Sequence, residues 1–190
     1  HHTRAENLYN LPSADYSADP GIYPFIGYLL LFKHLALNNT LSAYASEGGN
    51  FGLFTSHETI KRLNYKIYAE AKRLGSKWIL GGECGHMWRV MHQYMDTMNG
   101  PADFLEQPVS PFTGTHFENA ASTKMIHIVE FAADLIRHGK LNLDPAKNDH
   151  INVTFNDSFN PARVVGIFVE PRYVLSNVCK NFHEMPEHTI

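Results

Sequence analysis

Residues 78–90 read WILGGECGHMWRV, a stretch that joins an apolar run, two adjacent glycines, a cysteine, a histidine and an arginine. The first three residues, Trp78–Leu80, have the character of a fully buried strand, and the glycines after them let the backbone turn without a penalty from a Cβ atom. Beyond the turn, apolar residues recur at helical spacing at Met87, Val90, Met91, Tyr94 and Met98. The stretch predicts a strand, a turn and a helix.

Cys84 would lie at the carboxyl end of that strand and near the amino end of that helix, where the helix dipole favours a thiolate. This position predicts that Cys84 is a ligand or a nucleophile, with His86 as a neighbouring catalytic group. Two structural alternatives stay open: Cys84 as a buried core residue, and His86 as a helix cap. Arg89 fits either an anion site or an ion pair with Glu83.

Composition narrows the class of protein. The 190 residues are 44% hydrophobic, which suits a globular domain with part of a second. The formal charge of -3, with scattered Lys and Arg, argues against a nucleic-acid partner. The two cysteines, Cys84 and Cys179, exclude a disulfide framework and fit a reducing cytoplasm. The longest apolar stretch, Phe25–Leu37, is broken by Lys33 and His34 and falls short of the ~20 residues of a membrane helix.

Twelve histidines are present, but none forms the HExxH or HxH spacing of a conventional zinc site. The N-terminal pair His1 and His2, followed by Glu6–Tyr9, partly resembles a purification tag with a protease site. We therefore expect residues 1–10 to be tag-like or disordered.

The rest of the chain predicts alternating helices and strands. Four helices are expected: from an Asp19 cap to Leu35, from a Thr55-x-x-Glu58 capping box to Gly75, from Ser122 or Thr123 to Gly139, and from Pro171 onward. Four strands are expected, at Thr40–Ala45, Trp78–Leu80, Phe104–Val109 and Ile151–Phe155. Cys179 falls on the apolar face of the last helix and is expected in the core.

This alternation predicts an α/β fold, a Rossmann-like parallel sheet with flanking helices. In such sheets ligands bind outside the carboxyl ends of the strands. Three polar or glycine-bearing loops follow predicted strands: Glu47–Asn50, Glu83–His86 and Asn156–Arg163. We expect these loops to converge on one edge of the sheet.

Four runs then point to a family. Ala45–His57, Gly82–Val90, Gln93–Pro101 and Asn160–Arg163 together resemble the heterodisulfide-reductase-like subunits (DsrK, HmeD) of the Dsr membrane complex, which belong to the CCG-domain family. The resemblance covers nearly the whole chain from Leu11 onward. It implies a CCG-type domain organisation, with a first CCG-like α/β unit at residues 11–140 and the start of a second, truncated unit at residues 141–190.

The resemblance also implies an iron–sulfur cofactor of the 4Fe–4S type, held by a cysteine, a Cys-Cys-Gly and a Cys-x-x-Cys in each unit. Here Glu47-Gly48-Gly49 stands at the Cys-Cys-Gly, and Cys84 with Met87 stands at the Cys-x-x-Cys. In the second unit Asn156 and Phe159 replace a histidine and a cysteine. The implied cofactor-binding positions are Glu47, Gly48, Gly49, Asn50, Glu83, Gly85, Asn156, Phe159 and Arg163, with Cys84 as the metal ligand.

Clusters take about four protein ligands, so this chain by itself is expected to hold none and to be inactive in isolation. The implied function is that of an electron-transfer and disulfide-reductase-type subunit fragment of dissimilatory sulfur metabolism (sulfate reduction). Such a subunit reduces a disulfide or trisulfide of a small DsrC-type sulfur-carrier protein. Its other partners are a haem-containing membrane subunit, which holds it on the cytoplasmic face of the membrane, and further subunits of the complex.

Two alternatives of other classes stay open. The first is a cluster-free scaffold or partner-binding module of the same complex, favoured by the replaced ligands. The second is a thiol enzyme that uses Cys84 as its nucleophile and His86 as its base.

Overall fold

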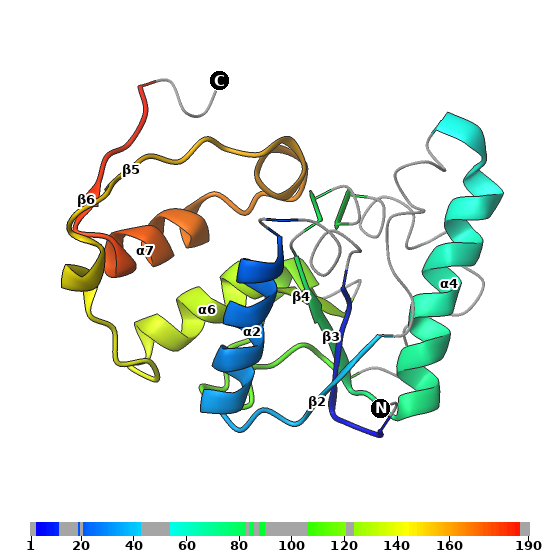
Figure 1. Ribbon diagram of the computed structural model, residues 1–190. Helices are drawn as coiled ribbons and strands as arrows, with labels where there is room; N and C mark the ends of the chain where they lie inside the picture. The colour runs from blue at the N-terminus through cyan, green and yellow to red at the C-terminus, as the bar shows by residue number, and fades with distance from the viewer. Residues whose placement is uncertain are drawn as a thin grey trace.

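The computed structural model describes residues 3–11, 19, 21–42, 54–82, 84, 85, 88, 89, 106–120 and 124–186, and the structural statements below concern these residues (Figure 1). Four short strands form one sheet: β1 (Asn7–Tyr9), β2 (Asn39–Leu41), β3 (Trp78–Gly81) and β4 (Met125–His127). Their order is β2-β1-β3-β4 and every neighbouring pair is parallel. The predicted α/β class and parallel sheet are confirmed.

Four α-helices accompany the sheet in the described part of the chain: α2 (Ile22–His34), α4 (His57–Leu74), α6 (Ile128–Arg137) and α7 (Val169–Val178). Shorter elements are the 3-10 turns η3 (Glu118–Ala120) and η4 (Pro145–Asn148), the π-helix η5 (Phe159–Val164), and the strands β5 (Asn152–Val153) and β6 (Asn181–Phe182). None of these helices is long and apolar enough to cross a bilayer.

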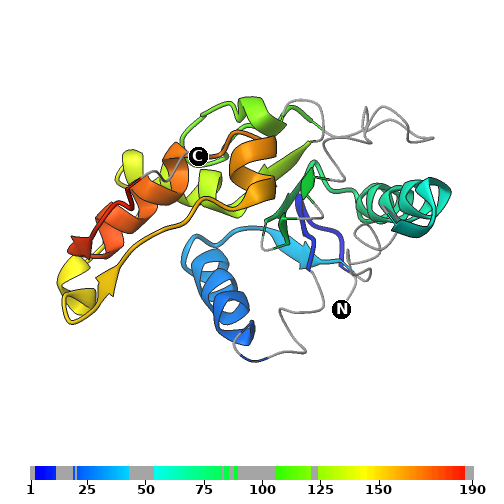
Figure 2. The same ribbon diagram turned by 90° about the horizontal axis from the view of Figure 1, so that it is seen from above.

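The helices cover both faces of the sheet, which lies between them (Figure 2). On one face, Leu8, Ile79 and Met125 pack with the buried side of α4. On the other, Tyr9, Leu80 and Ile126 pack with α2 and α6. Successive strand residues point to opposite faces of the sheet, so one apolar run contributes side chains to both cores. This is expected of parallel strands that are covered on both sides.

The N-terminus departs most from expectation. Asn7–Tyr9 are all buried and form β1, a central strand that pairs with β2 and β3, so the tag-like or disordered interpretation is wrong for these residues. The ENLY sequence resembles a protease site, yet it places Leu8 in one core and Tyr9 in the other. Tertiary pairing, which the local sequence does not reveal, gives this segment its structure.

A second correction concerns Met125–His127. These residues form the buried strand β4, whereas the sequence predicted that a helix already included Met125. The helix α6 begins at Ile128, and the His127 side chain caps it by accepting a hydrogen bond from the Val129 amide at 3.2 Å. A short apolar run fits a buried strand as well as a helix, which explains the error. The expected caps Ser122 and Thr123 lie outside the described residues.

Several helix boundaries also differ. Helix α2 follows Gly21 without a side-chain cap, so Asp19 is not its N-cap. Helix α4 is capped by Ser56, whose hydroxyl accepts from the Thr59 amide, and not by Thr55. Its end at Gly75, with φ of 69°, is as predicted. Helix α7 begins at Val169, two residues before Pro171.

Two predicted strands are reduced or absent. Within the described part of Phe104–Val109, Val109 makes only an isolated antiparallel bridge to His116. Ile151–Phe155 contains only the two residues of β5, which pair with β6 in a separate parallel pair. The loop that starts at Asn156 therefore does not leave a strand of the main sheet.

That loop is instead held by an ion-pair network at the start of α7. The Arg172 guanidinium donates to both carboxylate oxygens of Asp157, at 2.8 and 2.9 Å, and to Glu184 at 2.8 Å. The Asp157 side chain is fully buried. The hydrogen bonds to Asp157 and, to a lesser degree, to Glu184 raise the pKa of Arg172. Breaking such a buried pair by removing one partner typically costs about 3–5 kcal/mol, so the loop and α7 are firmly joined.

The close packing at Gly82 gives a stability prediction. A Cβ atom there would lie 2.8 Å from Cε1 of the His127 ring, and Gly82 has a φ of 134°. Gly82→Ala should lower the free energy of unfolding, measured with urea, by at least about 2 kcal/mol. Gly114→Ala is the matched control, because Gly114 also has a positive φ of 78° but has open space around its Cβ position. Equal losses in the two variants would show that the His127 contact contributes nothing.

Glu130 in α6 gives a pH prediction. Its side chain is 7% exposed, and burial raises the pKa of its carboxyl to about 7 despite a hydrogen bond from Asn119. The folded state thus holds this proton more tightly than the unfolded chain. The free energy of unfolding should fall as pH rises from about 4.5 through 7, by on the order of 3 kcal/mol.

Glu130→Gln should remove this slope, because the amide stays neutral at every pH. The variant should match the parent near pH 4 and exceed its stability at pH 8 in urea titrations. Glu118→Gln, which changes an exposed carboxylate nearby, is the control and should keep the parent's slope. A Glu130→Gln variant no more stable than the parent at pH 8 would contradict the assignment.

Candidate functional site

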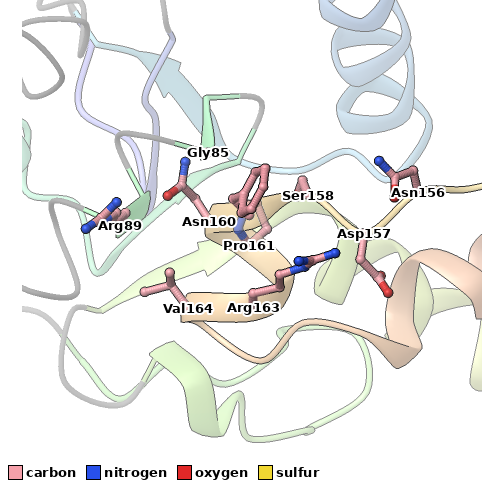
Figure 3. A pocket seen from close by; sticks show the side chains of 10 residues that line it. Gly85, Arg89, Asn156, Asp157, Ser158, Asn160, Pro161, Arg163 and Val164 are labelled. Carbon is pink, nitrogen blue, oxygen red and sulfur yellow. The ribbon is translucent and has the colours of Figure 1, made fainter. Parts of the chain in front are cut away.

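A pocket of about 650 Å³ lies beyond the carboxyl end of β3 (Figure 3). One wall comes from the segment after β3 and the other from the π-helix η5 with the residues before it. The lining residues are Gly85, Arg89, Asn156, Asp157, Ser158, Phe159, Asn160, Pro161, Arg163 and Val164. The two walls are thus about 70 residues apart in the sequence but adjacent in the fold.

A glycine allows the walls to meet. A Cβ atom on Gly85 would lie 2.9 Å from Cδ of Pro161 and 3.3 Å from Cβ of Asn160. The first distance is shorter than real Cβ contacts, so any side chain at position 85 would push the π-helix away. The Gly85–Pro161 contact therefore sets the spacing of the pocket walls.

The sheet topology explains why this pocket forms here. From the central strand β1 the chain crosses to β2 on one side and later to β3 on the other. The strand order therefore reverses between β1 and β3, and parallel sheets bind ligands outside the carboxyl ends of the strands at such a switch point. Gly82, Cys84 and Gly85, here named the Cys84 turn, follow β3 directly.

Cys84 begins a helical turn, since its carbonyl accepts a hydrogen bond from the Trp88 amide at 3.3 Å. The side chain is partly exposed and packs against the core cluster that contains Trp88. The Trp88 ring in turn lies 4.9 Å, centroid to centroid, from the His127 ring that contacts Gly82. The Cys84 turn thus packs against the core on one side and borders the pocket at Gly85 on the other.

The other wall has an unusual backbone. The π-helix contains the wide hydrogen bond from the Val165 amide to the Asn160 carbonyl at 3.1 Å. Asn160 and Ala162 are buried, whereas Phe159, which lines the pocket, is 73% exposed. Single π-turns are rare and occur frequently at functional sites.

The described lining contains cationic side chains. Arg89 and Arg163 both line the pocket, Arg163 with its guanidinium group at the wall, and the charge of Asp157 is compensated by Arg172. The Arg163 guanidinium lies over the Phe159 ring, 5.0 Å from its centroid, which holds the cation at the pocket wall. This arrangement favours negatively charged groups in the pocket.

The predicted site residues can now be placed. Gly85, Asn156, Phe159 and Arg163 line the pocket and Cys84 adjoins it, so two of the three loops lie together. The remaining residues, Glu47, Gly48, Gly49, Asn50, Glu83 and His86, lie outside the described residues. The cofactor-binding and catalytic roles assigned to all of them stay predictions.

Sequence reasoning missed two features of the site. Val164 lines the pocket because η5 extends through it, although the sequence predicted an irregular loop ending at Arg163. Asp157 is clamped by Arg172, a partner 15 positions away that no local pattern identifies. The local sequence did contain one indication of a constrained backbone, which is Pro161 within a polar stretch that contains asparagines.

The residues of this chain do not fit an iron–sulfur cluster. Such clusters take about four protein ligands, usually thiolates, and the sequence has two cysteines. Cys179 is buried at the end of α7 and lies outside the pocket lining. No three His, Cys, Asp or Glu side chains in the described part of the chain are grouped to bind a metal.

Comparison with known proteins gives two matches over nearly the whole of this chain. The "Hdr-like menaquinol oxidoreductase iron-sulfur subunit" of Archaeoglobus profundus is 49% identical over 98% of this chain, which spans 36% of that relative. The "Hdr-like menaquinol oxidoreductase iron-sulfur subunit 2" of Archaeoglobus fulgidus is also 49% identical over 98% of this chain, which spans 37% of it. The chain therefore spans little more than a third of the length of these relatives.

A shorter part of this chain matches a second group of proteins. One subunit of the "Dihydromethanophenazine:CoB--CoM heterodisulfide reductase" of Methanosarcina mazei is 40% identical over 55 residues, 29% of this chain and 13% of that relative. No protein-family model and no solved structure matches the chain. With 49% identity maintained over nearly its whole length, the chain belongs to the family of Hdr-like iron–sulfur subunits.

Proposed function

We propose that this chain is part of an electron-transfer subunit of a membrane-bound oxidoreductase complex and forms part of its disulfide-reducing site. The observation that carries the proposal is the Gly85–Pro161 contact, which puts the Cys84 turn and the π-helix on one pocket of about 650 Å³. The substrate is a disulfide or trisulfide of a small sulfur-carrier protein of the DsrC type. The relatives' names and the shorter match to a heterodisulfide reductase support this proposal.

The charge of the pocket suits this chemistry. Reduction of a disulfide to two thiols consumes two electrons and two protons, and negative charge builds up on sulfur as the S–S bond breaks. Arg163, held over Phe159, would stabilise a thiolate in the pocket, as preorganised charge does in other active sites. The exposed Phe159 ring, which lines the pocket, would give an apolar contact for the carrier.

The cofactor of the whole protein would be an iron–sulfur cluster of the 4Fe–4S type in a CCG-type domain. This chain would contribute one ligand to the cluster, Cys84. The remaining ligands would come from polypeptide outside this chain. The electron donor would be a haem-containing membrane subunit that holds the complex on the cytoplasmic face of the membrane, in dissimilatory sulfate reduction. The menaquinol oxidoreductase names of the relatives support a membrane complex.

A second candidate is a cluster-free scaffold that docks a partner through the same pocket. Asn156 and Phe159 stand where the family has metal-binding side chains, and a 73% exposed phenylalanine suits a protein contact. In this case Cys84 would serve packing alone.

Substitution of each cysteine in the full complex separates the two candidates. Cys84→Ser should lower the rate of reduction of a carrier disulfide by at least about tenfold and lower the iron and acid-labile sulfide content. Cys179→Ser is the matched control, because Cys179 is buried at the end of α7, and it should leave both within about twofold. Unchanged iron, sulfide and rate in Cys84→Ser would exclude the redox role and favour the scaffold.

A further inference from the structure

A second, smaller cavity lies between η3, α6 and the start of α7. Its volume is about 220 Å³, and it shares no lining residue with the pocket beside the Cys84 turn. The helices α6 and α7, which form two of its sides, lie next to each other (Figure 1). The ionisable residues of its described lining are His116, Glu118, Glu130, Asp134, Arg137 and Glu170. Here named the α6 pocket, this cavity is thus rich in carboxyl groups.

Glu130 is the buried acid of the α6 pocket with an unused oxygen. The residue is 7% exposed, and its Oε1 atom accepts a hydrogen bond from Asn119 at 2.9 Å. Its Oε2 atom is buried and has no hydrogen-bond donor in the described part of the chain. Such an oxygen is costly to bury, because the protein does not replace the water that it loses. The α6 pocket therefore contains an acceptor that lacks a donor.

Arg137, the arginine of this lining, does not supply that donor. Its guanidinium lies over the Tyr173 ring, 4.8 Å from the centroid, and pairs with Glu170 at 3.8 Å. A separation of 3.8 Å is longer than a hydrogen bond, so Glu170 also keeps the capacity to accept one.

Asp134 shows what a satisfied acid looks like in the same lining. One of its carboxylate oxygens lies 3.1 Å from Nδ1 of His138, and the other accepts a hydrogen bond from the Thr113 hydroxyl at 2.6 Å. Glu118 is exposed, and neither Glu118 nor Glu130 has a cationic partner among the described residues. The α6 pocket thus has carboxyl oxygens to spare and lacks positive charge.

We propose that the α6 pocket binds an ammonium group, which donates a hydrogen bond to Oε2 of Glu130 and is surrounded by the carboxylates of Glu118 and Glu170. An ammonium group has three N–H donors and no acceptor, so it complements a lining of carboxyl oxygens. The last torsion of a glutamate side chain is soft, so a small rotation turns Oε2 toward a ligand in the cavity.

The chemistry of the lining favours an N–H donor over a metal ion. The His, Cys, Asp and Glu side chains of the described residues are not grouped to bind a metal. Two sources present an ammonium group: a lysine side chain of polypeptide outside this chain, and a free primary amine. The site they share is separate from the pocket beside the Cys84 turn and goes beyond the proposed function.

Carbodiimide crosslinking of the intact complex separates the two sources. This reagent joins a carboxylate to an amine in direct contact and leaves no spacer between them. A crosslink from Glu118, Glu130 or Glu170 to a lysine outside residues 1–190, weakened by excess methylammonium, would assign the ammonium group to that lysine. A crosslink to a lysine of this chain would show that the chain fills its own pocket and would overturn the proposal.

Without any such crosslink, the pocket is free for a small amine, and calorimetric titration of the same complex with methylammonium chloride tests it. At pH 8 Glu130 is mostly ionised, since burial raises its pKa to about 7. Methylammonium should bind with a dissociation constant below about 10 mM, and tetramethylammonium, which has the same charge but no N–H donor, at least about tenfold more weakly. Equal binding of the two cations, or no binding together with no crosslink, would overturn the proposal.

A variant ties the result to the buried acid. Glu130→Gln keeps the shape of the side chain but removes its charge, and should weaken methylammonium binding, or lower the yield of the lysine crosslink, at least about tenfold. The variant is expected to be more stable than the parent at pH 8, so unfolding would not explain a loss. Glu58→Gln, which changes an exposed carboxylate on α4 across the sheet, is the matched control and should stay within about twofold of the parent. Equal effects of the two substitutions would contradict the role of Glu130.

Discussion

The architecture of the site depends on one steric constraint: there is no room for a Cβ atom at Gly82 or at Gly85. The His127 ring occupies the space at Gly82, and Pro161 occupies the space at Gly85. These two contacts join the end of β3 to the start of α6 on one side and to the π-helix on the other. Cys84 lies between them, so its position is set by packing on both sides of the turn.

The rest of the pocket follows from how its second wall is anchored. Arg172 clamps the buried Asp157, which ties the segment before the π-helix to α7 and removes a negative charge from the lining. Arg163 then remains over Phe159 as a cation at the wall. The Arg172–Asp157 pair thus anchors the second wall and neutralises the carboxylate in the lining. With Arg163 at the wall, the pocket favours a ligand that develops negative charge.

The sequence predicted the elements whose patterns are local. Gly75 at the end of α4, the buried strand β3 and the alternation that implies a parallel sheet are all visible in short windows. The sequence fails to predict the elements that tertiary contacts decide. The residues of β1 resemble a tag but form a central strand, and the pattern around Met125 favours a helix where the structure has β4. The Asn156 loop reaches the expected edge, but through a π-helix and a distant arginine rather than from a strand of the main sheet.

The most direct test of the steric constraint is a nuclear Overhauser measurement between the Gly85 Hα protons and the Pro161 Hδ protons. Since the Cβ position of Gly85 lies 2.9 Å from Cδ of Pro161, we expect a strong cross-peak between them. A cross-peak between Gly82 Hα and the His127 ring serves as the internal reference, because the Cβ position of Gly82 lies 2.8 Å from that ring. The reference peak without the Gly85–Pro161 peak would show that the two walls do not meet, and would contradict the constraint on which the site depends.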